Sequence, residues 1–136
     1  MAGRKYDGLI VTRPKDVGER VPRGPSTRVL WLDQEVVPGA FFVGCSWYWP
    51  GQWVPEPMAE AHTHPFDEVI AFVGTNADDP QDLGGEIELW LEDEPYILTK
   101  SCLVFIPKGL KHCPLIVRRV DRPIFHFITG PEGTYA

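Results

Sequence analysis

The amino-acid sequence predicts an all-β protein, built as an antiparallel sandwich or a small barrel. From about residue 28 onward, short runs rich in Val, Ile, Phe, Tyr and Trp are separated by Gly, Pro and Asp, which is the pattern of strands and turns. No run has both the length and the three-to-four-residue period of a helix. The 136 residues have the usual size of one domain, and 13 glycines and 14 prolines fit many turns between short elements.

Eight apolar runs, each bounded by turn residues, are expected to form strands. In chain order they are 28–32 (RVLWL), 41–49 (FFVGCSWYW), 67–73 (DEVIAFV), 86–91 (EIELWL), 95–99 (PYILT), 102–106 (CLVFI), 113–118 (CPLIVR) and 123–128 (PIFHFI).

Residues 1–30 differ from the rest of the chain and are expected to form an irregular basic arm, leaving 31–136 as the barrel domain. The arm carries a net charge of +4, whereas the remainder carries −10. Pro14, Pro22 and Pro25 interrupt any regular period. The opposite charges suggest that the arm lies over the acidic body or over a second subunit.

The overall composition argues against several partners. A net charge of −6 disfavours a nucleic-acid backbone or an anionic membrane. No stretch approaches the roughly 20 apolar residues of a membrane span, and the N-terminal apolar run is too short for a signal peptide. The three cysteines, Cys45, Cys102 and Cys113, form no CxxC pair and are expected to be reduced, buried thiols. We therefore expect a cytoplasmic protein.

An acidic segment, 75–85, separates two of the predicted strands. Its residues Asp78, Asp79 and Asp82 raise the possibility of calcium, but the alternating oxygen ligands and closing Glu of an EF-hand loop are missing. A solvated turn is the favoured interpretation.

Potential metal ligands gather in the segment from His62 to Glu68. Side chains two apart on an extended strand point to the same face, so His62 and His64 can reach one ion. The turn favoured by Pro65 would bring Glu68 back toward them. Taken alone, the two histidines could equally form a solvated or hydrogen-bonded pair. A second turn, PKGLKH, delivers His112 to the start of a later strand.

Together these segments resemble the two signatures of the cupin superfamily. The first, HxHxxxE followed by Gly, corresponds to His62, His64, Glu68 and Gly74, and the second, PxGxxH, ends at His112. The resemblance covers roughly residues 40–130. It implies a double-stranded β-helix, a small jelly-roll barrel whose mouth holds a metal ion bound by His62, His64, Glu68 and His112.

Three imidazoles and one carboxylate suit one divalent transition metal, Fe, Mn, Ni, Co or Zn, better than Ca(II) or Cu(I). An octahedral ion would keep two positions open for substrate, water or dioxygen. A closed structural zinc site is the alternative, although such sites are usually rich in cysteine.

Aromatic and aliphatic residues near the predicted site are candidates for the substrate pocket. They could line a cavity, but the strand aromatics could also be core or a dimer seam. The candidates are Trp47, Trp49, Trp53, Ile70 and Phe72.

Two residues are candidates for catalysis, Glu68 and His126. His126 lies between two phenylalanines in IFHFITG, where a histidine is usually a core residue. The alternative is a general acid or base near the metal, because the pKa of imidazole suits proton transfer near neutrality.

The resemblance favours a metal-dependent cupin enzyme that acts on a small molecule by oxygenase, isomerase or lyase chemistry. The alternative is a non-catalytic ligand-binding or sensory cupin, and a structural or storage role fits least. The resemblance also implies a homodimer formed through an edge strand, because unprotected edges favour pairing.

Overall fold

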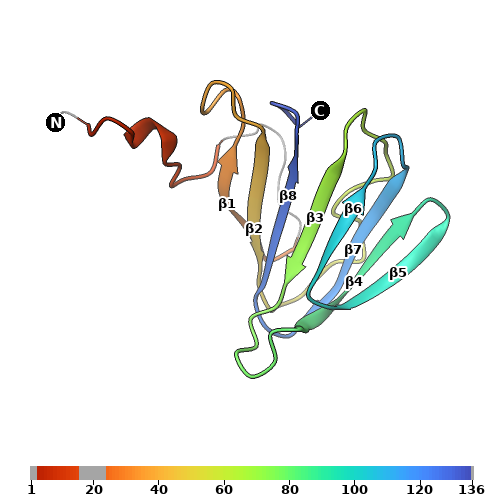
Figure 1. Ribbon diagram of the computed structural model, residues 1–136. Helices are drawn as coiled ribbons and strands as arrows, with labels where there is room; N and C mark the ends of the chain where they lie inside the picture. The colour runs from red at the N-terminus through yellow and green to blue at the C-terminus, as the bar shows by residue number, and fades with distance from the viewer. Residues whose placement is uncertain (1–2, 16–23, 136) are drawn as a thin grey trace.

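The computed structural model describes residues 3–15 and 24–135, and within them almost all regular structure is β-strand. Two antiparallel sheets form the two walls of a barrel (Figure 1). One sheet has five strands in the order β1-β2-β8-β3-β6, and the other has three in the order β5-β4-β7. The elements are the short 3₁₀ helix η1 (Asp7–Leu9), β1 (Ser26–Leu32), β2 (Phe42–Tyr48), β3 (Glu68–Val73), β4 (Asp82–Leu91), β5 (Glu94–Lys100), β6 (Cys102–Ile106), β7 (His112–Val120) and β8 (Ile124–Gly130).

All eight predicted strands are present, and the largest difference is the start of β4. The sequence predicts a start at residue 86, but β4 begins at Asp82. Leu83 is completely buried, while Gly85 lies so close to the carbonyl oxygen of Arg119 that no side chain would fit. Glycine here serves close packing between strands rather than a turn.

The core lies between the two sheets. Tyr48, Phe72 and Ile124 contribute from the five-stranded sheet, and Ile87 and Val117 contribute from the three-stranded sheet. Because both sheets bury one face in this way, the chain alternates between inward apolar residues and outward residues along most strands.

This alternation corrects the predicted role of two tryptophans in β2. Phe42 and Tyr48 are buried, with 0% and 2% of their surfaces exposed, so the even-numbered residues of β2 point inward. Trp47 and Trp49 therefore point outward, where their rings stack with centroids 5.5 Å apart. They do not line the inside of the barrel, because the pairing register assigns the inward direction to the even-numbered positions.

The described part of the N-terminal arm contacts the body through opposite charges. Lys15 lies 2.8 Å from the buried carboxylate of Asp33 and also pairs with Glu35. Burial alone would raise the pKa of Asp33. Hydrogen bonds from Lys15 and Trp31 outweigh burial, so the pKa of Asp33 is lowered. β1 begins at Ser26, inside the range predicted as arm.

Several of the charges and turn residues assigned to the arm fall outside the described residues. They are Asp16, Glu19, Arg20, Pro22 and Arg23.

The remaining sequence expectations concern cysteines, the acidic loop and membrane spans. The three cysteines form no disulfide, and Cys113 is buried. Asp78 and Asp79 are exposed in a turn, where the side chain of Asn76 accepts a hydrogen bond from the Asp78 backbone. In the part of the chain that the structure describes, no helix is long and apolar enough to cross a membrane.

Candidate metal centre

The candidate ligands come from two segments that backbone pairing holds side by side. His62 and His64 lie in the connection between β2 and β3, and His112 is the first residue of β7. His62 and His112 form an isolated bridge, in which each backbone N–H donates to the other residue's carbonyl at 3.0 Å. The sequence suggested that the HxH pair lies on a strand, and the structure reduces this strand to a single bridge.

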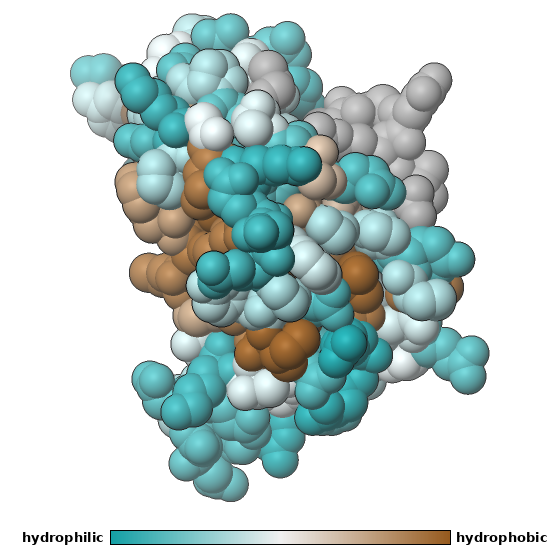
Figure 2. Space-filling view, turned by 90° about the vertical axis from the view of Figure 1, so that its right-hand side faces the viewer, coloured by the Kyte–Doolittle hydropathy of each residue, from teal (hydrophilic) through white to brown (hydrophobic). Residues whose placement is uncertain are grey.

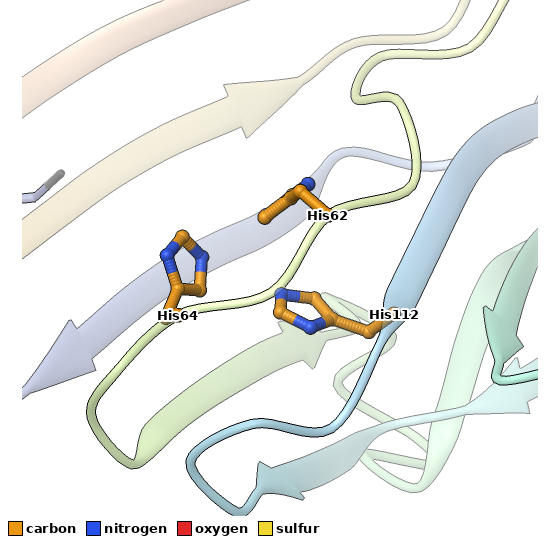
Figure 3. Close-up of side chains that lie close together, drawn as sticks. All are labelled: His62, His64 and His112. Atoms are coloured by element: carbon orange, nitrogen blue, oxygen red, sulfur yellow. The ribbon is translucent and has the colours of Figure 1, made fainter.

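The three imidazoles converge on one space. One ligand nitrogen from each ring lies within 4.8 Å of the other two. The centroid of the His62 ring is 4.6 Å from that of His64 and 4.4 Å from that of His112. Figure 3 shows these side chains gathered between the loop and the start of β7. Such spacing allows three nitrogens to bind one ion at about 2.0–2.2 Å each.

Glu68, the first residue of β3, completes the group. Its Oε1 atom is 3.3 Å from Nε2 of His112 and 3.8 Å from Nε2 of His64. The Glu68 side chain is 1% exposed, as is that of His112. The four residues that the sequence singled out as metal ligands are therefore brought together.

The polar atoms of this group have few partners within the protein. Both carboxylate oxygens of Glu68, together with Nε2 of His62 and Nε2 of His112, are buried without a hydrogen bond in the described part of the chain. Burying a carboxylate without a partner costs several kcal/mol. A divalent cation would neutralise Glu68 and accept the lone pairs of the imidazoles, so the donors fit a metal ion.

Backbone carbonyls set the tautomer of two of the imidazoles. Nδ1 of His112 lies 2.9 Å from the carbonyl oxygen of Leu110, and Nδ1 of His62 contacts that of Glu60. A carbonyl only accepts, so Nδ1 carries the hydrogen and the lone pair of Nε2 faces the centre. This is the arrangement of metal-binding histidines in general.

The charge state of His112 depends on its surroundings. Burial alone would lower the pKa of His112, but its contacts with Glu68 and the Leu110 carbonyl outweigh burial and raise it. The neighbouring Cys113 is a poor ligand in this state, because burial raises the pKa of its thiol to about 12.

Turns and aromatic rings hold the first histidine segment in place. The backbone N–H of Gly109 donates to the carbonyl of His64 at 2.8 Å, and φ of Gly109 is 83°, which favours glycine. The His64 ring stacks on Phe66 at 4.7 Å and lies 5.1 Å from Tyr135. Tyr135 carries no recognisable sequence signal, because its proximity to His64 arises only from the tertiary fold.

Of the predicted pocket residues, Ile70 and Phe72 share the inner face of β3 with Glu68. Both belong to the hydrophobic core, and Trp53 packs against it with its ring 5.3 Å from that of Tyr48. Trp47 and Trp49 are on the outer face. The inner aromatic residues of β2 are thus Phe42 and Tyr48, neither of which the sequence analysis singled out.

His126 points inward but lies away from the three clustered histidines. It pairs with Phe72, which is four residues, or about 13 Å, along β3 from Glu68. Its ring stacks between Tyr48 at 5.1 Å and Phe72 at 4.8 Å, and Nδ1 contacts the Ala71 carbonyl at 3.1 Å. Burial lowers the pKa of His126 to about 4. The structure thus does not favour the predicted acid–base role and places His126 in the core.

Comparison with known proteins supports the fold. No protein-family model matches the chain, and no curated protein sequence matches it. A recombinant oxalate oxidase in complex with glycolate is similar in structure, with a TM-score of 0.56 and 18% identity, over 99% of this chain and 64% of that chain. A second oxalate oxidase structure in complex with glycolate has a TM-score of 0.56 and 17% identity, over 96% of this chain and 62% of that chain.

A further similar structure is a conserved protein with a double-stranded β-helix domain from Klebsiella pneumoniae. Its TM-score is 0.50 at 17% identity, over 99% of this chain and 95% of that chain. The chain spans less than two thirds of the length of the oxalate oxidases. These likenesses show the fold, which is the double-stranded β-helix that the resemblance to cupins implied.

Proposed function

We propose that this protein is a metal-dependent enzyme that acts on a small organic molecule. The observation that carries the proposal is the convergence of His62, His64, Glu68 and His112. Both carboxylate oxygens of Glu68 and the Nε2 atoms of His62 and His112 are buried without a hydrogen bond in the described part of the chain. Unpaired buried polar atoms cost free energy, and such a cluster is expected where a ligand supplies the missing partner.

The donor set indicates the class of metal. Three nitrogens and one oxygen suit Fe, Mn, Ni, Co or Zn in the divalent state. When bound, such an ion supplies Lewis acidity and, if six-coordinate, two positions for exogenous ligands. His62 and His112 present Nε2 because carbonyls hold their Nδ1 hydrogens, and Glu68 supplies the negative charge.

The surroundings of the site indicate the kind of substrate. Phe66 and Ile106 are buried near Glu68 and His64, with 4% and 1% of their surfaces exposed. An apolar wall excludes water and favours a small molecule with apolar character and one group that binds the ion. Oxygenase, isomerase and lyase chemistry are all compatible with this arrangement.

Metal analysis of purified protein tests the site. We expect close to one transition-metal ion per chain by inductively coupled plasma mass spectrometry after purification without chelator. A His62→Ala, His64→Ala double variant should lose the ion, whereas His126→Gln, which changes a histidine outside the site, should retain it. Equal metal content in the wild type and the double variant would contradict the assignment.

Catalysis is tested separately from binding. With the identified metal restored, the wild type should convert at least one member of a panel of small organic acids and alcohols, followed by mass spectrometry. Glu68→Gln should stay folded and lose turnover. A protein that binds panel members at the metal but forms no product would instead be a ligand-binding module.

A further inference from the structure

One row of side chains on the inner face of the five-stranded sheet is polar. Residues directly opposite each other on antiparallel strands point to the same side of a sheet. The pairing register places Arg28 of β1 opposite Ser46 of β2, and Ser46 opposite His126 of β8. Because the even-numbered residues of β2 point inward, all three side chains do so, and we call them the polar row.

A charge in this row is unusual. Charged side chains normally stay at the surface, and Figure 2 shows hydrophilic side chains, in teal, over much of the side of the molecule on which β5 lies. Among the described residues of the five-stranded sheet, Arg28 is the one positively charged side chain that the register directs inward. His126 adds no charge at neutral pH, because burial and, to a smaller extent, the charge of Arg28 lower its pKa to about 4.

Packing holds the guanidinium of Arg28 in place. Its Cζ atom lies 4.8 Å from the centre of the Trp31 ring, which is the distance of a cation–π contact. Trp31 is itself fixed, because its indole N–H donates to Asp33 at 2.9 Å and its ring lies against Gly44, where a Cβ atom would be only 2.4 Å away. A guanidinium held on an aromatic ring in this way loses little conformational entropy when it binds an anion.

The polar row is open to solvent although it points inward. All three of its residues are half-buried, and so is Ile128, the next inward residue of β8. β8 is paired on both sides, with β2 and with β3, so the exposed surface of His126 and Ile128 lies on their inward side chains. Solvent, and with it a small molecule, therefore reaches this part of the inner face.

The hydrogen-bonding groups of the row indicate the chemistry of a ligand. A guanidinium carries five N–H donors, so Arg28 can bind a carboxylate through two parallel hydrogen bonds in addition to its other contacts. Ser46 adds a hydroxyl donor on the neighbouring strand. Nδ1 of His126 contacts the Ala71 carbonyl at 3.1 Å and so carries the hydrogen, which leaves Nε2 as an acceptor that does not bind an anion. The row therefore favours a carboxylate held by Arg28 and Ser46.

An apolar row separates the polar row from the candidate metal centre. Glu68 and the polar row are two inward rows, or about 13 Å, apart along the strands. The row between them consists of Trp31, Gly44, Ile128, Ile70 and Val104. Because the guanidinium of Arg28 lies over Trp31, its charge leans over this middle row, on the side toward the metal centre.

We propose that Arg28 and Ser46 bind the carboxylate group of a small organic acid. The inference rests on the proposed function in one respect, which is that this acid is the substrate. Its carboxylate then lies at the polar row, its apolar body along the middle row and its reacting group at the ion. Binding of the carboxylate itself does not require the metal. The site should select organic acids over alcohols of the same length.

Isothermal titration calorimetry with hexanoate, an unbranched monocarboxylate, tests the site in the full chain. The wild type should bind hexanoate at least about 10-fold more tightly than hexan-1-ol. Arg28→Gln should weaken hexanoate binding by about 10- to 100-fold, because charge-assisted hydrogen bonds are lost, and Ser46→Ala by about 2- to 10-fold. Arg28→Lys keeps the charge but not the paired donors, and should bind hexanoate more tightly than Arg28→Gln.

Arg118→Gln is the matched control. Arg118 is an exposed arginine of β7 that pairs with Glu86 and Glu88, and its replacement changes the net charge by the same amount. The affinity for hexanoate should stay unchanged, and an equal loss in both glutamine variants would overturn the proposal. Circular dichroism should show the same β-sheet signal in every variant. If Arg28→Gln does not fold, Ser46→Ala decides, and an unchanged affinity there would overturn the proposal.

A metal-free arm separates this inference from the proposed function. The His62→Ala, His64→Ala double variant should still bind hexanoate, and adding Arg28→Gln should remove that binding. If the double variant loses hexanoate while Arg28→Gln alone keeps it, the carboxylate binds the ion, which overturns the polar row but not the metal site. If the wild type binds hexanoate through Arg28 but holds no metal, the carboxylate site stands and the proposed function is overturned.

Discussion

The barrel contains histidines in two environments, and their differences distinguish the proposed metal site from a packed core. At one end, His62, His64 and His112 converge, and the Nε2 atoms of His62 and His112 are buried without a hydrogen bond in the described chain. About 13 Å along β3, His126 lies between two aromatic rings. His62 in the first environment and His126 in the second are both half-buried, so burial alone does not distinguish the two environments. The first environment is distinguished by the convergence of imidazole nitrogens, two of which have no hydrogen bond in the described chain.

Removing a ligand should affect only the first environment, and this is the largest effect that we expect. His112→Ala should weaken binding of Co(II) by at least about 1,000-fold, because one of four ligands is lost and Glu68 loses its nearest neighbour. Titration followed by the visible absorption of bound Co(II) measures the change. His126→Phe serves as the control and should bind Co(II) like the wild type. If both variants bound equally weakly, the two environments would not be separate.

The difference between the two environments also shows what sequence can predict. The spacing in HTHPFDE and PKGLKH was sufficient to select four residues that converge in the structure, because each motif is local and backbone pairing needs only to bring two segments together. The eight strands were also predictable, since each is an apolar run bounded by turn residues.

It was harder to predict which side chains of a strand point into the barrel and which point outward. In β2, aromatic residues stand at both even-numbered and odd-numbered positions, so alternation alone could not decide whether Trp47 or Tyr48 points inward. Pairing with β8 and the buried Phe42 decide it in favour of Tyr48. Contacts between residues far apart in the sequence, such as that of Tyr135 with His64, have no local signal at all.

The second expected effect concerns the pH dependence of stability that His126 contributes. In the folded protein, the pKa of His126 is about 4, which is below the ordinary value of 6.5. Between these two pH values, His126 is therefore protonated in the unfolded chain but neutral in the folded chain. Stability from this residue is therefore fully present above pH 6.5 and falls as the pH approaches 4. The difference corresponds to about 3 kcal/mol.

His126→Phe keeps an aromatic ring between Tyr48 and Phe72 but cannot titrate. Urea unfolding at pH 7 and pH 4.5 should show a smaller loss of stability in the variant than in the wild type, by about 2–3 kcal/mol. The carboxylates and the other histidines are the same in both proteins, so their contributions to the pH dependence of stability cancel in this comparison. An identical loss in the two proteins would mean that His126 is protonated in the folded state at pH 4.5.

The smallest effect concerns a residue that touches a ligand without binding the ion. Tyr135 packs against His64 with ring centroids 5.1 Å apart, and against Phe42 at 5.3 Å. Such aromatic contacts contribute about 0.5–1.5 kcal/mol, so Tyr135→Ala should weaken Co(II) binding by up to about 10-fold. Tyr135→Phe should restore most of the affinity if ring packing orients His64. Trp49→Ala, on the outer face, is the control and should leave the affinity for Co(II) unchanged. If Trp49→Ala weakened binding as much as Tyr135→Ala, the affinity would depend on general loosening of the barrel rather than on the orientation of the His64 imidazole.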